Sequence, residues 1–216
     1  MRINKYIALA TGKGRREADR LIKSGRITID GRIADLGQDI DGQEIRLDGR
    51  RLIIDRSFTT IMLNKPTGYV VSRKGQGSKT IYELLPDKYS DLKPIGRLDK
   101  DSSGLLLLTN NGQMAEQLTH PSYQKIKVYL VQLNKPLSQK DQSQIEQGVS
   151  LEDGLSKMKL KKMEKSTQYL VTITEGRNRQ IRRTFKFLDY EVVNLHRLQF
   201  GNYQLGKLAS GRYTEI

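Results

Sequence analysis

Residues 96–109 read GRLDKDSSGLLLLT, and this stretch decides the fold. The four successive leucines predict a strand, and the Asn-Asn-Gly turn at residues 110–112 separates that strand from a helix expected at residues 113–118. Asp99 lies before the strand in a glycine-flanked loop, where a carboxylate can be held in position. By spacing alone, however, an aspartate in such a loop is more often a turn former than a catalytic group.

Apolar and alternating segments on both sides of this stretch predict more secondary structure. Residues 73–79 contain two glycines and are expected to form a loop, and Ser138 has the position of a helix N-cap. Further strands are expected at residues 60–63, 68–72, 125–133 and 169–174. Residues 59–216 are therefore predicted to form an α+β domain with a mixed, largely antiparallel β-sheet.

The N-terminal part of the chain has a different pattern. Apolar residues at helical spacing predict two short amphipathic helices, at residues 3–10 and 18–22. An Asp-Gly turn at residues 30–31 joins two short alternating stretches as a hairpin, and another strand is expected at residues 44–47. We assign a small α/β module to residues 1–48 and a linker to residues 49–58.

The charge balance indicates a polyanionic partner. The chain has 38 Lys and Arg against 24 Asp and Glu, a net charge of +14 and a pI near 9.9. Residues 1–32 carry nine basic and three acidic side chains, net +6, and residues 157–186 carry ten and two, net +8. Two separate contacts with nucleic acid fit this distribution, and the alternative is that these charges only keep helices solvated.

Several protein classes are disfavoured by what the chain lacks. It has no cysteine and two histidines, His120 and His196, so we expect neither a disulfide nor a metal site. We expect both histidines to be structural or to face RNA. No run of 18 apolar residues occurs, so we expect no membrane span and a cytoplasmic location.

Three N-terminal stretches resemble the RNA-binding module of ribosomal protein S4. They are residues 2–5 (RINK), 15–19 (RREAD) and 25–31 (GRITIDG). The resemblance implies that the basic face of the two helices lies against RNA phosphates, which assigns RNA contacts to Arg2, Lys5, Arg15, Arg16 and Arg20.

The stretch around Asp99 resembles the active-site motif of pseudouridine synthases of the RsuA and RluB type. Residues 64–68 (NKPTG), 125–131 (KIKVYLV) and 175–183 (EGRNRQIRR) resemble further motifs of this family in the same order. The resemblance spans almost all of residues 60–216. It implies an RNA isomerase that needs no cofactor and in which Asp99 is the catalytic residue.

The resemblance also implies roles for other residues. Asp99 would attack the ribose of a flipped-out uridine or remove a ribose proton, and the sequence leaves both routes open. Arg177 would keep Asp99 ionised, with a phosphate contact as the alternative. Tyr129 would stack on the extruded base, although an aromatic residue in a strand is ordinarily core packing.

The remaining candidates would form the walls and mouth of the site. Ile181 and Leu195 would exclude water, with ordinary core packing equally open. RNA contacts are expected from Arg179, Arg182 and Arg183, and less strongly from Lys65 and Arg97. The expected partner is structured ribosomal RNA, or else transfer RNA, bound by a monomer. A non-catalytic, ribosome-associated RNA-binding factor is the alternative, and a methyltransferase is disfavoured because no glycine-rich nucleotide-binding motif is present.

Overall fold

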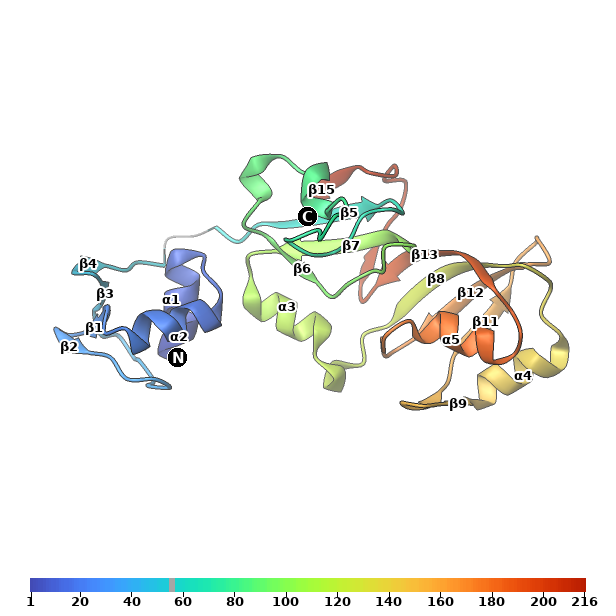
Figure 1. The fold of residues 1–216 in the computed structure, drawn as a ribbon, viewed down its shortest axis with the longest axis horizontal. Helices are drawn as coiled ribbons and strands as arrows, with labels where there is room; N and C mark the ends of the chain where they lie inside the picture. Colours follow the sequence, from blue (N-terminus) through green and yellow to red (C-terminus); the bar gives the residue numbers. More distant parts are fainter. Residues whose placement is uncertain (55–56) are drawn as a thin grey trace. The chain divides into compact units, whose positions relative to one another are not determined.

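The computed structural model describes residues 1–54 and 57–216 of the chain. These residues divide into two compact units, Met1–Phe58 and Thr59–Ile216. Each unit encloses its own cluster of buried apolar side chains. Figure 1 labels the elements of both units.

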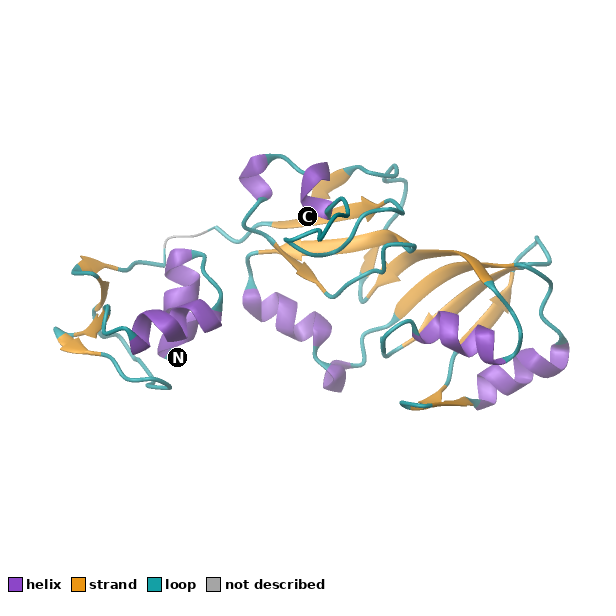
Figure 2. Cartoon of the chain, viewed as in Figure 1, coloured by secondary structure: helices purple, strands orange, loops and turns teal. Residues whose placement is uncertain are grey.

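The first unit contains two helices and a four-stranded antiparallel sheet (Figure 2). Isoleucines of the helices and the strands, among them Ile3, Ile7, Ile27 and Ile45, are fully buried between them. The two predicted helices, the hairpin and the third strand are all present. The elements are α1 (Ile3–Thr11), α2 (Arg15–Lys23), β1 (Ile27–Ile29), β2 (Arg32–Ile33), β3 (Ile45–Leu47) and β4 (Arg50–Arg51).

The linker expected at residues 49–58 begins later than predicted. Asp48 and Gly49 both have positive φ, 49° and 77°, which is the conformation that a two-residue hairpin turn requires. This turn pairs β4 with β3, so that the chain stays in the first sheet. Leu52 follows, packs against the same core and accepts a hydrogen bond from the Tyr6 hydroxyl at 2.9 Å. Residues 55–56 of the expected linker lie outside the described residues.

The second unit is built on one nine-stranded sheet (Figure 1). Its strands follow the order β11-β12-β8-β13-β7-β5-β15, while β6 pairs with β7 and β14 with β13. The predicted α+β fold with a largely antiparallel sheet is confirmed. The strands are β5 (Thr60–Lys65), β6 (Lys93–Ile95), β7 (Ser103–Thr109), β8 (Lys127–Leu133), β11 (Lys159–Lys162), β12 (Gln168–Ile173), β13 (Val192–Phe200), β14 (Tyr203–Gln204) and β15 (Tyr213–Glu215).

Three helices and a small hairpin complete this unit. Asn111 and Ser138 cap the first two helices, because their side-chain oxygens accept hydrogen bonds from backbone N–H groups of the first turn. The last two helices lie on the same side of β8, β12 and β11 (Figure 2). These elements are α3 (Gly112–Thr119), α4 (Gln139–Gln147), α5 (Gln180–Phe187), β9 (Val149–Leu151) and β10 (Gly154–Ser156), with short 3-10 turns at residues 81–84, 87–89 and 121–123.

The leucine run forms a central strand that is buried on both faces. Leu106 and Leu108 belong to the large core of the unit, whereas Leu105 and Leu107 belong to a second core on the other face. Successive side chains of a strand point to opposite faces, so four consecutive leucines satisfy both cores. The expected strand at residues 68–72 is wrong, because there the structure has only one isolated bridge, between Val70 and Thr80.

β7 and β13 form the one parallel pairing among the described strands. Two residue pairs hold them in register, His196 with Ser103 and Arg197 with Gly104. Gly104 has φ 103°, and a Cβ atom there would lie 2.3 to 2.9 Å from backbone atoms of Arg197. Only glycine therefore allows the two strands to meet here. The loop that carries Asp99 ends at this junction.

Candidate active site

A cavity of about 780 Å³ opens beside the Asp99 loop, entirely within the second unit. The lining comes from the loop before β7, the paired strands β8 and β13, and the segment from the end of β12 into α5, and it is completed by the end of α3 and by β10. Of the residues predicted for the site, the cavity brings together Arg97, Asp99, Tyr129, Arg177, Ile181 and Leu195. Lys65, Arg179, Arg182 and Arg183 do not line it.

The Asp99 loop is held from below by a buried lysine. Lys65 ends β5 with no exposed surface, and its Nζ donates to the carbonyl oxygens of Pro66 (3.0 Å), Asp99 (3.0 Å) and Ser102 (2.7 Å). The predicted RNA contact of Lys65 is therefore wrong, because RNA cannot reach a fully buried ammonium group. Lys65 instead fixes the backbone from which the Asp99 carboxylate projects.

Burial lowers the pKa of Lys65 to about 8, although Asp101 and Asp99 act to raise it. Since the pKa is below that of an unfolded lysine, the unfolded chain binds more protons between pH 8 and 10.5, and stability contributed by this group rises over that range. Above about pH 8 the Lys65 ammonium becomes a neutral amine, which has two protons to donate to the three carbonyl oxygens that position the Asp99 loop. We expect activity to fall above about pH 8 without a fall in melting temperature, measured by pH–rate profiles beside thermal unfolding. A joint loss of both would contradict this account.

Two aspartates of the loop have different surroundings. Asp101 accepts two hydrogen bonds from Arg179, at 3.0 and 2.9 Å, and lies 3.3 Å from Arg182 Nε. The hydrogen bonds from Arg179 are the main cause that lowers the pKa of Asp101. Asp99 is 3.5 Å from Arg179 Nη1, and its side chain is 36% exposed on the cavity. Asp99 is thus the carboxylate left free to meet a ligand.

The predicted ion pair between Arg177 and Asp99 is replaced in the structure by one with Arg179. The Arg177 guanidinium instead holds the β9–β10 hairpin. It donates to Asp153 Oδ1 at 2.9 Å and to the carbonyl oxygens of residues 153, 154 and 155 at 2.8 to 3.0 Å, and it also binds Glu175. These acceptors occupy both Nη groups of Arg177, its buried Nε has no partner among the described residues, and no ion pair joins it to Asp99. Arg179 reaches Asp99 from the start of α5, where its own φ is 45°.

The other arginines predicted at the mouth also have protein partners. Arg183 donates two hydrogen bonds to Asp153, at 3.0 and 2.6 Å. Arg182 is mostly buried and donates to the carbonyl oxygens of Val192 (2.6 Å) and Asp101 (2.9 Å). Arg182 therefore holds α5 against the Asp99 loop, and its predicted role as a phosphate contact is wrong. Arg97 is exposed on the cavity.

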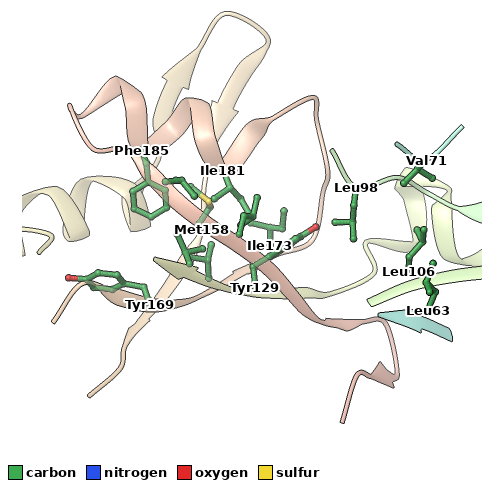
Figure 3. Close-up of a cluster of buried hydrophobic side chains, with 14 of the residues drawn as sticks. Leu63, Val71, Leu98, Leu106, Tyr129, Met158, Tyr169, Ile173, Ile181 and Phe185 are labelled. Carbon is green, nitrogen blue, oxygen red and sulfur yellow. The ribbon is translucent and has the colours of Figure 1, made fainter. Parts of the chain in front are cut away.

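Apolar side chains form one wall of the cavity. Tyr129 is 7% exposed, and its hydroxyl end points towards Leu98, the neighbour of Asp99 in sequence (Figure 3). Ile181 and Leu195 are almost fully buried, line the cavity and belong to the same core as Tyr129. These residues pack in the core and line the cavity at once, and their predicted roles towards a bound base stay predictions.

The cavity residues that the sequence analysis missed include two cations, Lys127 and Arg197. Lys127 is two residues before Tyr129 in β8, and Arg197 pairs with Tyr129 across the sheet. Strand alternation puts all three side chains on one face, so the spacing of Lys127 from Tyr129 was a usable signal. Ser102 also lines the cavity and has a buried hydroxyl with no hydrogen-bond partner among the described residues.

The predicted RNA contacts of the first unit lie on its two helices and at the N-terminus. Arg15, Arg16 and Arg20 belong to α2 and are exposed, with Arg20 bound to Glu17 at 3.0 Å. Lys5 lies on α1, and the exposed Arg2 forms an ion pair with Asp39. Most of the basic face predicted from the sequence is thus available to a ligand.

The histidines take part in local hydrogen bonds. The His196 ring lies 2.8 Å from the Ser103 hydroxyl, and burial lowers its pKa. His120 lines the cavity and contacts Ser122. No cluster of three or more possible metal ligands occurs in the described part of the chain. None of the described helices combines the length and apolar character needed to cross a bilayer.

Comparison with known proteins assigns both units. Residues 59–187 match the family model described as RNA pseudouridylate synthase, and residues 1–45 match the S4 domain. An RNA pseudouridine synthase of Aquifex aeolicus (strain VF5) is 35% identical over all of this chain and 90% of its own length. Ribosomal large subunit pseudouridine synthase B of Bacillus subtilis (strain 168) is 34% identical over all of this chain and 91% of its length.

A solved structure shows the same fold. The crystal structure of a pseudouridylate synthase superposes with a TM-score of 0.72 and 31% identity, covering all of this chain and 96% of the other. Sequence, fold and site geometry thus agree over the full length of the chain. The chain belongs to the RsuA- and RluB-type family of RNA pseudouridine synthases, with an N-terminal S4 domain.

Proposed function

We propose that the protein converts one uridine of ribosomal RNA to pseudouridine and that Asp99 is the group that acts on the ribose. The observation that carries this proposal is the difference in surroundings between two neighbouring carboxylates, Asp99 and Asp101. Asp101 is held by Arg179 and Arg182, whereas Asp99 faces the cavity with Tyr129 on the adjacent wall. A target uridine has to leave its stack to reach this carboxylate, and an aromatic ring in the cavity can stack on the extruded base.

The reaction needs an ionised carboxylate and no other reagent. In one route Asp99 attacks C1′ and the bond to N1 breaks, so that uracil leaves as an anion. The base then turns, C5 bonds to C1′ and displaces Asp99, C5 loses its proton and N1 gains one. In the other route Asp99 first removes the C2′ proton to give a glycal. In both routes the Arg179 guanidinium, 3.5 Å from the Asp99 carboxylate, provides a positive charge beside it.

Ribosomal RNA is proposed as the substrate because the Bacillus subtilis relative is named for the large ribosomal subunit. This substrate places the enzyme in the cytoplasm. We also propose that the protein acts as a monomer. Transfer RNA, or RNA binding without catalysis, are the outcomes that would replace this assignment.

The proposed reaction can be tested with RNA that carries tritium at C5 of uridine, because isomerisation releases that hydrogen to water. We expect tritium release from ribosomal RNA at one site, without added cofactor or metal. In cells that lack the gene, the same site should carry uridine in place of pseudouridine. Release from transfer RNA alone would reject the substrate but keep the enzyme class. No release from any RNA would reject the enzyme activity.

The S4 domain is proposed to bind RNA phosphates through α2. Replacing Arg15 and Arg16 with glutamine should weaken RNA binding and lower the slope of log Kd against log salt by about two, since each phosphate contact contributes about one. Fluorescence anisotropy at several salt concentrations measures this slope. Arg50 and Arg51, exposed in β4, provide a control pair with the same loss of charge. Equal slopes for both pairs would argue against a specific contact by α2.

A further inference from the structure

Among the cations that line the cavity without a carboxylate partner, two lie beside Tyr129 in the sheet. Lys127 begins β8, and Arg197 lies beside Tyr129 in β13. Both approach the ring of Phe200, with Lys127 Nζ 5.5 Å and Arg197 Cζ 5.0 Å from its centroid. Across the described ranges, 1–54 and 57–216, neither forms an ion pair.

Backbone groups satisfy only part of their hydrogen-bonding capacity. Arg197 is 2% exposed and donates from Nε to the carbonyl oxygen of Leu105 at 2.7 Å, while its buried Nη2 has no partner among the described residues. Lys127 Nζ has two long hydrogen bonds, both 3.3 Å, to carbonyl oxygens of Lys125 and Glu175. Two positive charges thus share one cavity wall without compensation.

The nearest carboxylate is already engaged. Glu175 acts to raise the pKa of Lys127, but its Oε1 accepts hydrogen bonds from Arg177 and Gln180. Burial, followed by the charge of Arg197, has the larger effect and lowers the pKa of Lys127. Lys127 is half-buried and Arg197 is 2% exposed, and a cation that is buried without a counter-charge opposes folding, so neither charge accounts for the stability of the unit.

We propose that Lys127 binds one phosphate group of the RNA, the phosphate next to the uridine that enters the cavity, and that the buried charge of Arg197 beside it adds to the positive potential there. This proposal rests on the proposed function, which places that uridine against Tyr129. A phosphodiester carries a permanent negative charge and several acceptor oxygens, and it therefore compensates both cations and takes the free donors of Lys127. A neutral uracil ring can accept hydrogen bonds but cannot neutralise the two charges.

The position of the pair agrees with this ligand. Tyr129 lies in β8 two residues beyond Lys127 and directly opposite Arg197. In the proposed complex, a nucleotide whose base stacks on this ring has its ribose beside Asp99. Its two flanking phosphates are bonded to the 5′ and 3′ oxygens of that ribose. Other phosphates of the RNA are left to exposed basic side chains, among them Arg97 at the cavity.

The experiment couples the loss of one protein charge with the loss of one RNA charge. The probe is the shortest ribosomal RNA fragment that the wild-type protein converts, prepared with a single neutral methylphosphonate at each phosphate around the target in turn. Binding is measured by fluorescence anisotropy in an Asp99→Asn background, with and without Lys127→Met. Lys140→Met, on exposed α4, removes an equal charge elsewhere and serves as the control.

We expect Lys127→Met to weaken binding of the unmodified RNA about 10- to 100-fold, the range of a charge-assisted hydrogen bond, and Lys127→Arg to restore much of it. With methylphosphonate at one phosphate beside the target, Lys127→Met should have little further effect. Coupling at no phosphate would overturn the proposal. So would a slower conversion with unchanged binding, because that result would assign Lys127 to the departing uracil.

Thermal unfolding separates this role from a structural one. Because the charge of Lys127 opposes folding, Lys127→Met should keep or raise the melting temperature while RNA binding falls. A lower melting temperature together with weaker binding at every phosphate would show a structural role and overturn the proposal. Failure of the wild-type protein to convert any RNA would be a separate result, against the proposed function.

Discussion

Replacement of Asp99 by asparagine is expected to lower the rate of pseudouridine formation about 10³-fold or more, with RNA binding nearly unchanged. The amide is a poor nucleophile and a poor base, so it fails in either route at the ribose. It has the same shape as the carboxylate, and Asp99 contributes its backbone carbonyl rather than its side chain to the contact with Lys65. Single-turnover tritium release and equilibrium binding measure the two effects separately.

Asp101 provides the matched control for this substitution. Asp101→Asn removes a carboxylate of the same loop, two residues away, and weakens its contacts with Arg179 and Arg182. We expect a smaller loss of rate, because Asp101 orients the loop and does not face the cavity. Near-normal turnover by Asp99→Asn, with loss of turnover in Asp101→Asn, would show that Asp101 and not Asp99 acts on the ribose.

Replacement of Lys65 by methionine is the second change with a large expected effect. The carbonyl oxygens of Pro66, Asp99 and Ser102 lose their shared donor, and each unsatisfied buried carbonyl costs about 1–3 kcal/mol. Removal of a buried charge offsets part of this cost, so we expect a net loss of about 2–3 kcal/mol. A displacement of Asp99 by about 1 Å is enough to lower turnover about 10²-fold.

The measurement compares denaturant unfolding, RNA binding and turnover for Lys65→Met and for Lys100→Met. Lys100 lies in the same loop, but it is exposed and contacts the Ser78 hydroxyl at 3.1 Å. The control should retain stability and turnover. If Lys65→Met kept full turnover below pH 8, the buried ammonium would not be what positions Asp99.

The main elements of the fold were predictable because they depend on local patterns. The leucine run predicted the central strand β7, since four successive apolar residues are typical of a strand that is buried on both faces. Of two Asp-Gly turns, the one at residues 30–31 was identified and the one at residues 48–49 was missed. The second turn joins β3 to β4, and β4 consists only of Arg50 and Arg51. Two successive arginines show no alternation of apolar and polar residues, so no sequence pattern indicated a strand there.

The site was predictable in its members but not in their pairing. Arg177 and Arg179 are two residues apart, and sequence alone cannot tell which one reaches Asp99. The difference comes from the left-handed backbone of Arg179 and from the hairpin acceptors that occupy Arg177. Lys65 and Lys127 look like surface lysines in sequence, and their burial depends on strands that lie far away along the chain.

The relative position of Asp99 and Tyr129 depends on the short pairing of β7 with β13 at Gly104. Asp99 precedes β7, whereas Tyr129 lies in β8 beyond β13, so the carboxylate and the aromatic ring to which we assign the reaction belong to opposite halves of the sheet. Those halves are joined by two residue pairs. Any side chain larger than hydrogen at residue 104 would therefore push apart Asp99 and Tyr129 together with the two strands.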